Sequence, residues 1–435
     1  GLLTPLLLGS VVTVPFLLPP IGPNSVPADF FNAVFVVLGA TVLLRTRTPV
    51  RLPLGGSYLL IVTGGLLAVT QSVVPRESLV AVVQDGYLFV WFVIVVNFLL
   101  LDDGRTARHV AILWTAVGVV VAVVVWGAAL GYPEDIPYLF GYPLVDIYGR
   151  SEGTFRDPNM AGNYLVLSLF VLWAAPRPRN VAVKLALTIP FFFGIYVTQS
   201  ITALVTLVGG AVVAATIAFV GRREVVVAAA MAVIAAALIA ALALPDDILD
   251  RSADATGSLG QTEVFDESLG RSNSSLSLRA QRWEEAFRFF GSSIVLGIGP
   301  SSTDESLASR GAPISGEIHN DYMAGLLERG LLGGLGNVFL FVVAAGWSLR
   351  VGLDKKYAAQ GWRPSALVGG IVVVLMAAMS LETLHFRHVW LFLAVVVALG
   401  IRGSGSEVAV SSPASFERRP RTAPFKPRPR AANAP

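Results

Sequence analysis

The sequence has no cysteine and few charged residues, and both absences narrow its class. Without cysteine the chain can form no disulfide, no zinc–cysteine site and no thiol nucleophile. Only 14% of its 435 residues are charged, whereas soluble domains carry about 25%. Hydrophobic residues make up 54% of the chain, and apolar runs of about 20 residues recur. We therefore predict an all-α, polytopic integral membrane protein.

The apolar runs predict about twelve transmembrane helices with one large outer loop. The runs are residues 1–19, 28–44, 54–74, 79–101, 109–131, 159–175, 181–199, 201–220, 224–244, 331–349, 365–384 and 386–402. They divide the chain into 1–244 with nine helices, an outer loop over 245–330, and 331–402 with three helices. The remaining residues, 403–435, are rich in Pro and Arg and predict a disordered basic tail.

Positive charge alternates between successive loops, which orients the predicted helices. Arg and Lys gather in loops 45–53, 102–108, 176–184, 221–224 and 350–364 and in the tail. The loops between them, 20–27, 75–78 and 385–388, hold only Arg76 and Arg387. The positive-inside rule thus predicts a multi-pass protein of the cytoplasmic membrane with both termini in the cytoplasm. Segments 132–158 and 245–318 then lie outside, and the tail is expected to meet anionic lipid headgroups rather than nucleic acid.

An arginine-rich helix is predicted within the larger outer segment. Arg279, Arg282, Trp283 and Ala286 follow a spacing of three, four and seven residues, so they share one helical face. Guanidinium groups beside an indole suit phosphate, because each guanidinium can donate two parallel hydrogen bonds. An amphipathic helix that lies on the membrane and contacts lipid phosphate fits the same pattern. Both interpretations stay open on this stretch alone.

Two glycine-containing turns are the next candidates for elements that contact a ligand. The turn GIGPSS, residues 297–302, lacks the lysine of a phosphate-binding loop, so we expect it to bend the backbone close to a ligand or another helix. In GRSEGTFRDPNMAG, Arg150 and Arg156 flank a turn, and Asn159 is expected to start the next helix. A helix N-terminus beside two arginines favours an anion, although a plain capped helix near lipid headgroups has the same pattern.

The stretch HNDYMAGLLERGLLGG places His319 before a predicted helix that begins near Asn320 or Asp321 and ends at Gly330. The positive end of that helix dipole favours the neutral imidazole, which can accept a proton from an attacking hydroxyl. An interfacial histidine satisfied by water is the alternative.

Two further polar groups lie in or at the end of apolar runs. Glu382, His385 and His388 have the spacing of one helical face, which could be a metal site or the ordinary polar end of a membrane span. Asp85 lies inside an apolar run, where a carboxylate is costly, so we expect it to contact substrate or pair with another helix.

In combination, these motifs resemble the O-antigen ligase and polymerase superfamily of membrane glycosyltransferases. The resemblance rests on GRSEGTFRDPNMAG, on RAQRWEEAF with the following GIGPSS, and on HNDYMAGLLERGLLG, in this order along the chain. It implies glycan transfer at the outer face of the membrane without a metal ion or cofactor. The donor would be a glycan linked to polyprenyl diphosphate, and the acceptor a hydroxyl on a lipid or another glycan.

The resemblance also implies roles for individual residues. Arg279 is similar to the arginine that grips diphosphate, and His319 to the histidine that activates the acceptor. The predicted substrate-binding residues are Arg150, Arg156, Asn159, Arg282, Trp283, Asn320, Tyr322 and Glu328. One departure is TQSI at residues 198–201, which has isoleucine where the family pattern Thr-x-Ser-Arg has arginine, so Arg282 or Arg156 is expected to replace that contact.

A transferase fits the pattern better than two other classes do. A transporter or flippase of lipid-linked glycans would carry charges deep in several spans, whereas here Asp85 is the clearly central one. A scaffold would not need so much outward-facing arginine. Whether the enzyme is a ligase or a polymerase depends on its acceptor, which no motif identifies.

Overall fold

The computed structural model describes residues 3–20, 26–131, 136–146, 148–220, 281–312 and 316–403. Nearly all regular structure in these ranges is α-helix, together with one two-residue hairpin, β1 (Tyr138–Leu139) with β2 (Tyr142–Pro143). The first helices are α1 (Leu3–Thr13), α2 (Pro27–Arg45), α3 (Gly55–Val69), α4 (Pro75–Leu100), α5 (Arg105–Leu130), α6 (Pro158–Ala174), α7 (Val181–Val197) and α8 (Ile201–Val220). Residues 281–290 are helical and lead into the 3₁₀ turn η1 (Gly291–Ser293). The rest are α12 (Thr303–Ser309), α13 (Asp321–Leu353), α14 (Lys355–Ala359), α15 (Pro364–Ala377), η2 (Thr383–His385) and α16 (Arg387–Gly403).

The predicted apolar runs coincide with these helices, which confirms the all-α class. Each of them contains a helix except 224–244, which lies outside the described residues, as do residues 245–280 of the outer loop and the tail after residue 403. In the described part of the chain, five helices are long and apolar enough to cross a membrane: α2, α4, α5, α8 and α13. The helices α1, α3, α7 and α15 are also apolar but shorter. The chain is therefore a multi-pass helical protein, and twelve spans remain a prediction.

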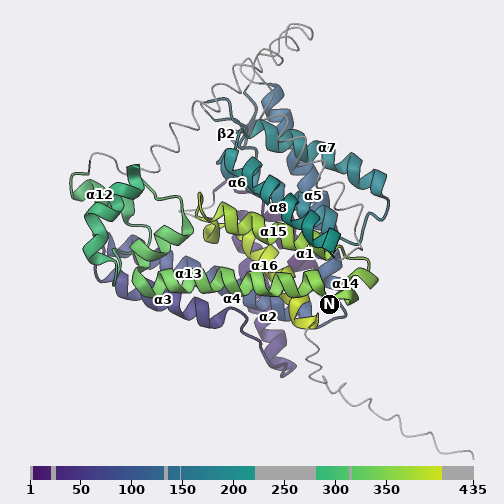
Figure 1. Cartoon of the computed structure of the whole chain (residues 1–435), viewed down its shortest axis with the longest axis horizontal. Coiled ribbons are helices and arrows are strands. Elements are labelled where there is room, and N and C mark those ends of the chain that lie inside the picture. The colour runs from purple at the N-terminus through teal and green to yellow at the C-terminus, as the bar shows by residue number, and fades with distance from the viewer. Residues whose placement is uncertain are drawn as a thin grey trace, which may run out of the picture.

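Helices α6 and α16 form the interior of the bundle, with almost every residue of each buried (Figure 1). The C-terminal end of α6 is closed by Lys184, which is 1% exposed. Its ammonium donates to the carbonyls of Leu172, Trp173 and Ala175 at 2.8, 3.1 and 2.8 Å. A cation at this end satisfies the carbonyls that a helix leaves unpaired and complements the helix dipole.

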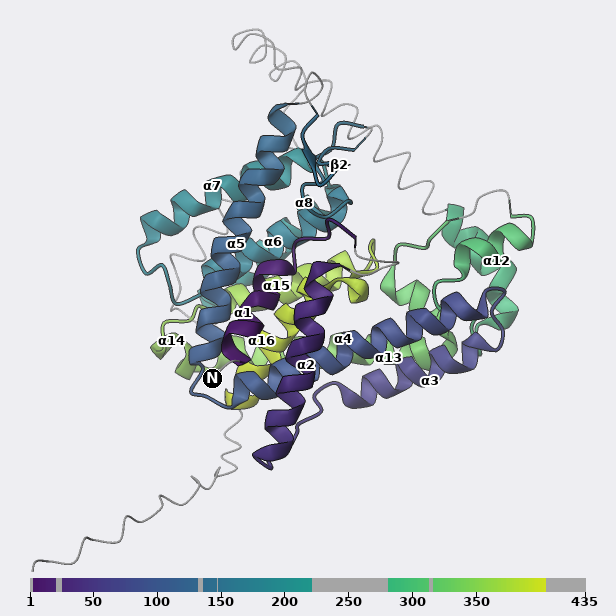
Figure 2. The ribbon, with the colours of Figure 1, turned by 180° about the vertical axis from the view of Figure 1, so that it is seen from behind.

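Helices α3 and α13 run side by side at one edge of the bundle, as both views show (Figures 1 and 2). Glycines allow their backbones to touch. A Cβ at Gly64 would lie 2.4 Å from the carbonyl oxygen of Arg329, and a Cβ at Gly336 would lie 2.8 Å from that of Ser57. Residues 281–312, including α12, lie beyond the end of this helix pair (Figures 1 and 2).

Contacts at the two ends of α16 sort the loops into the two groups that the charge pattern predicts. At its first turn the Arg387 guanidinium holds both carboxylate oxygens of Asp29 at 2.7 and 2.6 Å. At its last turn Arg402 lies 3.7 Å from Asp102, in the loop between α4 and α5. The loops before α2 and α16 thus share one end, and the loop before α5 lies at the other. Which end faces the cytoplasm stays a prediction.

Candidate active site

The segment that contains His319 forms a capped helix start, as predicted. The Asn320 side chain accepts hydrogen bonds from the backbone amides of Tyr322 and Met323, both at 3.0 Å, and α13 begins at Asp321. Gly330 has φ 67° and ψ −170°, so the helical backbone breaks there before a second helix continues to Leu353. The predicted stop at Gly330 is therefore confirmed. His319, immediately before the cap, has φ 50°.

The GIGPSS turn packs against the break at Gly330, which confirms that it brings the backbone close to another helix. The amides of Ile298 and Gly299 donate to the carbonyls of Leu327 and Glu328, both at 3.0 Å. A Cβ at Gly297 would lie 2.5 Å from the amide nitrogen of Gly330, and the φ of Gly297 is +83°. Only glycine fits this crossing of two backbones without displacement.

Glu328 ties this turn to α13 from inside. Its carboxylate accepts hydrogen bonds from the Ser301 amide at 2.9 Å and from the Thr303 hydroxyl at 2.7 Å, and the residue is 5% exposed. Both oxygens are engaged by groups of the chain itself, so the contacts indicate a positioning role for this predicted substrate-binding residue.

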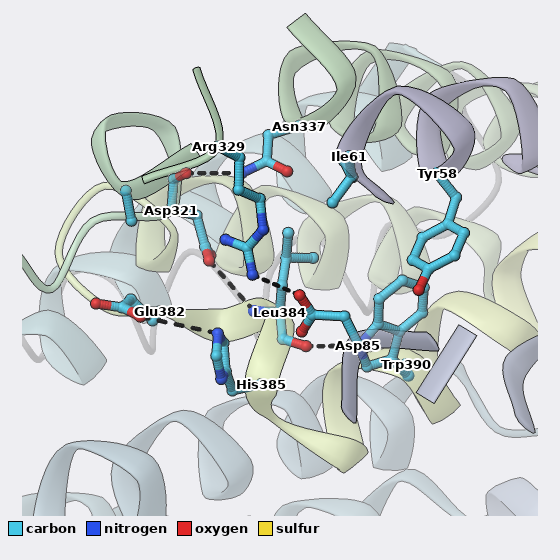
Figure 3. A pocket seen from close by; sticks show the side chains of 11 residues that line it. Tyr58, Ile61, Asp85, Asp321, Arg329, Asn337, Glu382, Leu384, His385 and Trp390 are labelled. Carbon is cyan, nitrogen blue, oxygen red and sulfur yellow. Dashed lines mark hydrogen bonds and ion pairs between the residues drawn. The ribbon is translucent and has the colours of Figure 1, made fainter. Parts of the chain in front are cut away.

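A buried ion pair lies behind the same helix turn. The guanidinium of Arg329 donates a hydrogen bond to the carboxylate of Asp85, and their side chains are 7% and 11% exposed (Figure 3). Tyr58 from α3 and Trp390 from α16 line the cavity around them. Asp85 therefore pairs α4 with α13, which was one of its two expected roles.

The loop over residues 378–386 closes the cavity from the other side. Asp321 accepts from the amide and the hydroxyl of Thr383 at 2.8 and 2.6 Å. The Asn320 amide group donates to the carbonyl of Met379 at 2.9 Å, and the Tyr322 hydroxyl donates to that of Leu375 at 3.2 Å. The residues around His319 thus hold this loop in place, and Asn320 and Tyr322 already have partners within the chain.

Carboxylates gather beside His319, which the sequence did not indicate. Its Nδ1 lies 3.7 Å from a carboxylate oxygen of Glu317. Ligating atoms of Glu317, His319 and Glu382 all lie within 4.8 Å of one another. The Glu382 carboxylate is also 3.8 Å from Nε2 of His385 (Figure 3). We call these four residues the His319 cluster. Its spacing would also admit a metal ion, so the predicted metal independence needs a direct test.

The carboxyl group of Glu382 in the His319 cluster binds its proton more tightly than usual. Glu382 follows the end of α15 at Ala377 and precedes α16, so it lies in the loop rather than in either helix. Burial raises the pKa of its carboxyl group well above the usual range, and the carboxylates of Glu328 and Glu317 add to this.

Helix 281–290 lies directly against the residues that precede His319. The Trp283 indole donates to the carbonyl of Ile318 at 3.0 Å. A Cβ at Gly316 would lie 2.8 Å from the central carbon of the Arg282 guanidinium. The nitrogen Nε of Arg282 is buried and has no hydrogen-bond partner in the described part of the chain. Arg282 and Trp283 are therefore close to His319, whereas Arg279 lies outside the described residues.

A second group of predicted residues meets at the start of α6. Asp157 caps this helix by accepting from the amides of Asn159 and Met160 at 2.6 and 2.9 Å, so α6 begins at Pro158, one residue earlier than expected. The Arg150 guanidinium donates to the side chain of Asn159 at 3.0 Å and to the carbonyl of Thr198 at 3.2 Å.

The Arg150 guanidinium therefore contacts the TQSI segment. Ser200 of this segment also donates to Asn159 at 3.0 Å. Arg156 is exposed and stacks on Tyr142 at 5.3 Å, apart from the Arg150–Asn159 pair. Arg282 lies beside Gly316. The guanidinium in contact with TQSI is that of Arg150, and the replacement of the diphosphate contact by Arg282 or Arg156 stays a prediction.

The residues around Arg150 and Asn159 and the residues around His319 lie at the same end of the bundle. Thr202, in the first turn of α8, shares a hydrogen bond of 2.9 Å with Ser380. Ser380 follows Met379, whose carbonyl accepts from Asn320. The TQSI segment and the start of the His319 helix are therefore joined through one loop.

The interpretation of Glu382, His385 and His388 as one helical face was wrong. His385 belongs to η2, and His388 lies in α16, where its Nε2 is 2.9 Å from the side-chain oxygen of Asn163. The three residues span a loop and a helix start, so the helical spacing does not apply. The contact that matters, between Glu382 and the His319 segment, crosses about 60 residues of sequence and had no local signal.

Comparison with known proteins agrees with these motifs. Residues 185–338 match the family model described as O-antigen ligase. A search of curated proteins found no match to the chain. The matched region includes TQSI, the arginine helix, GIGPSS and most of α13 up to Val338. This match over about a third of the chain, together with the apolar helices, supports an O-antigen ligase-like membrane protein, and that family implies a glycosyltransferase-like enzyme of polysaccharide biosynthesis.

Proposed function

We propose that this protein is a membrane glycosyltransferase of the O-antigen ligase type. It transfers a glycan from a polyprenyl-diphosphate carrier to a hydroxyl of a lipid or glycan acceptor, at the extracytoplasmic face of the cytoplasmic membrane. The observation that carries this proposal is the contact of helix 281–290, with Arg282 and Trp283, against the segment that presents His319. An anion-binding face and a base are thereby close together.

Glycan transfer from a diphosphate carrier requires few further groups from the protein. Diphosphate is a weakly basic leaving group, so it needs neutralisation of its developing charge more than protonation. Guanidinium groups fixed in a partly dry site supply this. The buried Nε of Arg282, which has no partner among the described residues, is a candidate donor, and Arg279, three residues earlier on the predicted face, would be its neighbour.

His319 accepts the proton of the acceptor hydroxyl. As that proton leaves, the acceptor oxygen bonds to the anomeric carbon, and the bond from that carbon to the diphosphate oxygen breaks with its electron pair. One base suffices for this step, so neither a metal ion nor a cofactor is required in the proposal.

Arg150 and Asn159 form the second predicted anion contact. Their hydrogen bond and the contact of Arg150 with Thr198 hold the guanidinium at the end of the bundle that also carries the His319 segment. We assign to Arg150, rather than to Arg156 or Arg282, the position that arginine holds in the family pattern Thr-x-Ser-Arg.

Variants of the proposed residues test the assignment. Purified protein in detergent receives a polyprenyl-diphosphate-linked glycan and a glycan acceptor, and the new glycosidic product is measured. We expect His319→Ala and Arg279→Ala to abolish transfer. The matched controls His109→Ala and Arg288→Ala, both at exposed residues, keep it. Wild-type rates in both His319→Ala and Arg279→Ala would refute the assignment.

Polymerase activity is the second candidate, because the same donor and base would serve it. The two differ only in the acceptor: a polymerase extends another lipid-linked glycan, whereas a ligase transfers to a finished lipid. Defined acceptors of both kinds, offered together, decide between them by the product formed.

A further inference from the structure

Glu382 is held firmly at the edge of the cavity. Its loop is tied by two hydrogen bonds from Thr383 to Asp321 and by the bond of Asn320 to Met379. The Glu382 side chain is 20% exposed. A carboxylate kept in so sheltered a position costs solvation energy, which a neighbouring positive charge would offset.

Two imidazoles flank this carboxylate. His385 Nε2 is 3.8 Å from Oε2 of Glu382, and a ring nitrogen of His319 lies within 4.8 Å of the Glu382 carboxylate. The 3.8 Å contact is somewhat longer than a hydrogen bond, and catalytic contacts often tighten only when substrate binds. Figure 3 shows the Glu382 carboxylate directed at His385, and both residues line the cavity.

The other charged groups around the cluster are already occupied or exposed. Asp321 and Glu328 accept hydrogen bonds from Thr383, Ser301 and Thr303, and Arg329 is paired with Asp85. The Glu317 side chain is 72% exposed. Among the described residues, Arg282 also lies nearby, at Gly316 on the side of helix 281–290. Glu382 is therefore the sheltered carboxylate that faces both imidazoles.

We propose that Glu382 and His385 form a proton relay behind His319. The inference rests on the proposed function. When His319 takes the proton of the acceptor hydroxyl, the imidazolium is stabilised by the Glu382 carboxylate and passes its proton to it. Glu382 then hands the proton to His385, and water at the cavity mouth removes it. The electron pair of the broken sugar–oxygen bond leaves with the diphosphate, so charge and atoms balance.

The raised proton affinity of Glu382 supports this order of transfer. An ordinary carboxylate binds a proton much more weakly than imidazole does. Proton transfer from the imidazolium to such a carboxylate would therefore be unfavourable in free energy. Burial and the carboxylates of Glu328 and Glu317 raise the pKa of Glu382 well above its usual range. The difference in proton affinity between Glu382 and the imidazole of His319 is therefore smaller.

The test compares Glu382→Gln and His385→Gln with the exposed controls Glu305→Gln and His109→Gln. Transfer rates are measured from pH 5 to pH 9. We expect each relay variant to lose about 100-fold in kcat with little change in KM, because the proton-transfer step alone is affected. In Glu382→Gln the acidic limb of the kcat profile also moves to lower pH, and Glu382→Asp recovers part of the rate. The controls keep the wild-type profile.

An unchanged kcat and pH profile in Glu382→Gln overturns the relay. If that variant does not fold, His385→Gln decides, since its ring is 36% exposed on a short turn and its replacement leaves the core intact. The proposed function fails separately, through full activity of His319→Ala. Loss of transfer in His319→Ala together with a wild-type transfer rate in Glu382→Gln would therefore reject the relay but not the proposed transferase function.

Discussion

Breaking the buried ion pair between Asp85 and Arg329 should destabilise the protein strongly. In Asp85→Asn, the Arg329 guanidinium stays buried at 7% exposure without its carboxylate. Removing one partner of a buried pair costs about 3 to 5 kcal/mol. We expect the lower bound, about 3 kcal/mol, because the Glu328 carboxylate, 4.0 Å from Arg329, remains as a weaker partner. Such a loss corresponds to roughly a 150-fold change in the unfolding constant.

Equilibrium unfolding in detergent micelles measures this loss. Arg288, whose side chain is 70% exposed and lies 3.5 Å from Glu285, provides the control, and Arg288→Gln should cost no more than about 0.5 kcal/mol. The double variant Asp85→Asn/Arg329→Met should cost less than the sum of the two single changes, since no unpaired charge is left. A loss of less than about 1 kcal/mol in Asp85→Asn would refute the reasoning.

Three further predictions concern different parts of the molecule. Burial raises the pKa of Glu152 from 4.5 to about 7, with Asp146 and Asp157 adding to it. The stability that this group contributes is therefore complete below pH 4.5 and is lost as pH rises through about 7. Glu152→Gln should unfold at higher denaturant than wild type at pH 8 and at the same concentration at pH 4. Gly330→Ala should destabilise the protein more than Gly311→Ala. Both positions have φ near +70°, but of the two only Gly330 has an atom, the Val295 carbonyl oxygen, 2.4 Å from the added Cβ. Equal unfolding midpoints of the two variants would contradict this prediction. EDTA should leave the transfer rate unchanged, and a loss restored by added metal would show that the His319 cluster holds an ion.

Local features of the fold could be predicted from the sequence because their causes are local. The apolar runs mark helices, since a membrane offers no partner to a free backbone amide. Asn320 followed by an apolar run marks a helix start, and Gly330 its stop. The glycines of GIGPSS indicated a close backbone approach, which they make against α13. The alternation of basic loops agrees with the placement of the loops before α2 and α16 at one end and of the loop before α5 at the other.

Contacts between distant segments could not be predicted in the same way. Asp85 was a candidate for helix pairing, but its partner Arg329 is 244 residues away in the sequence. The approach of Glu382 to His319 depends on the loop between α15 and α16, whose path is set by Asp321 and Thr383. Helical spacing suggested His388 as a neighbour of His385, yet α15 ends before Glu382 and a new helix begins at Arg387. Periodicity carries no information across such a break.

The central claim is that the diphosphate bond of a lipid-linked glycan is broken as a new glycosidic bond forms. Purified protein, a donor labelled in its polyprenyl diphosphate and an unlabelled acceptor allow both events to be counted in one reaction. We predict equal amounts of free polyprenyl diphosphate and glycosylated acceptor for the wild type, and neither for His319→Ala. A protein that moves the intact donor across vesicle membranes and releases no polyprenyl diphosphate would contradict the account.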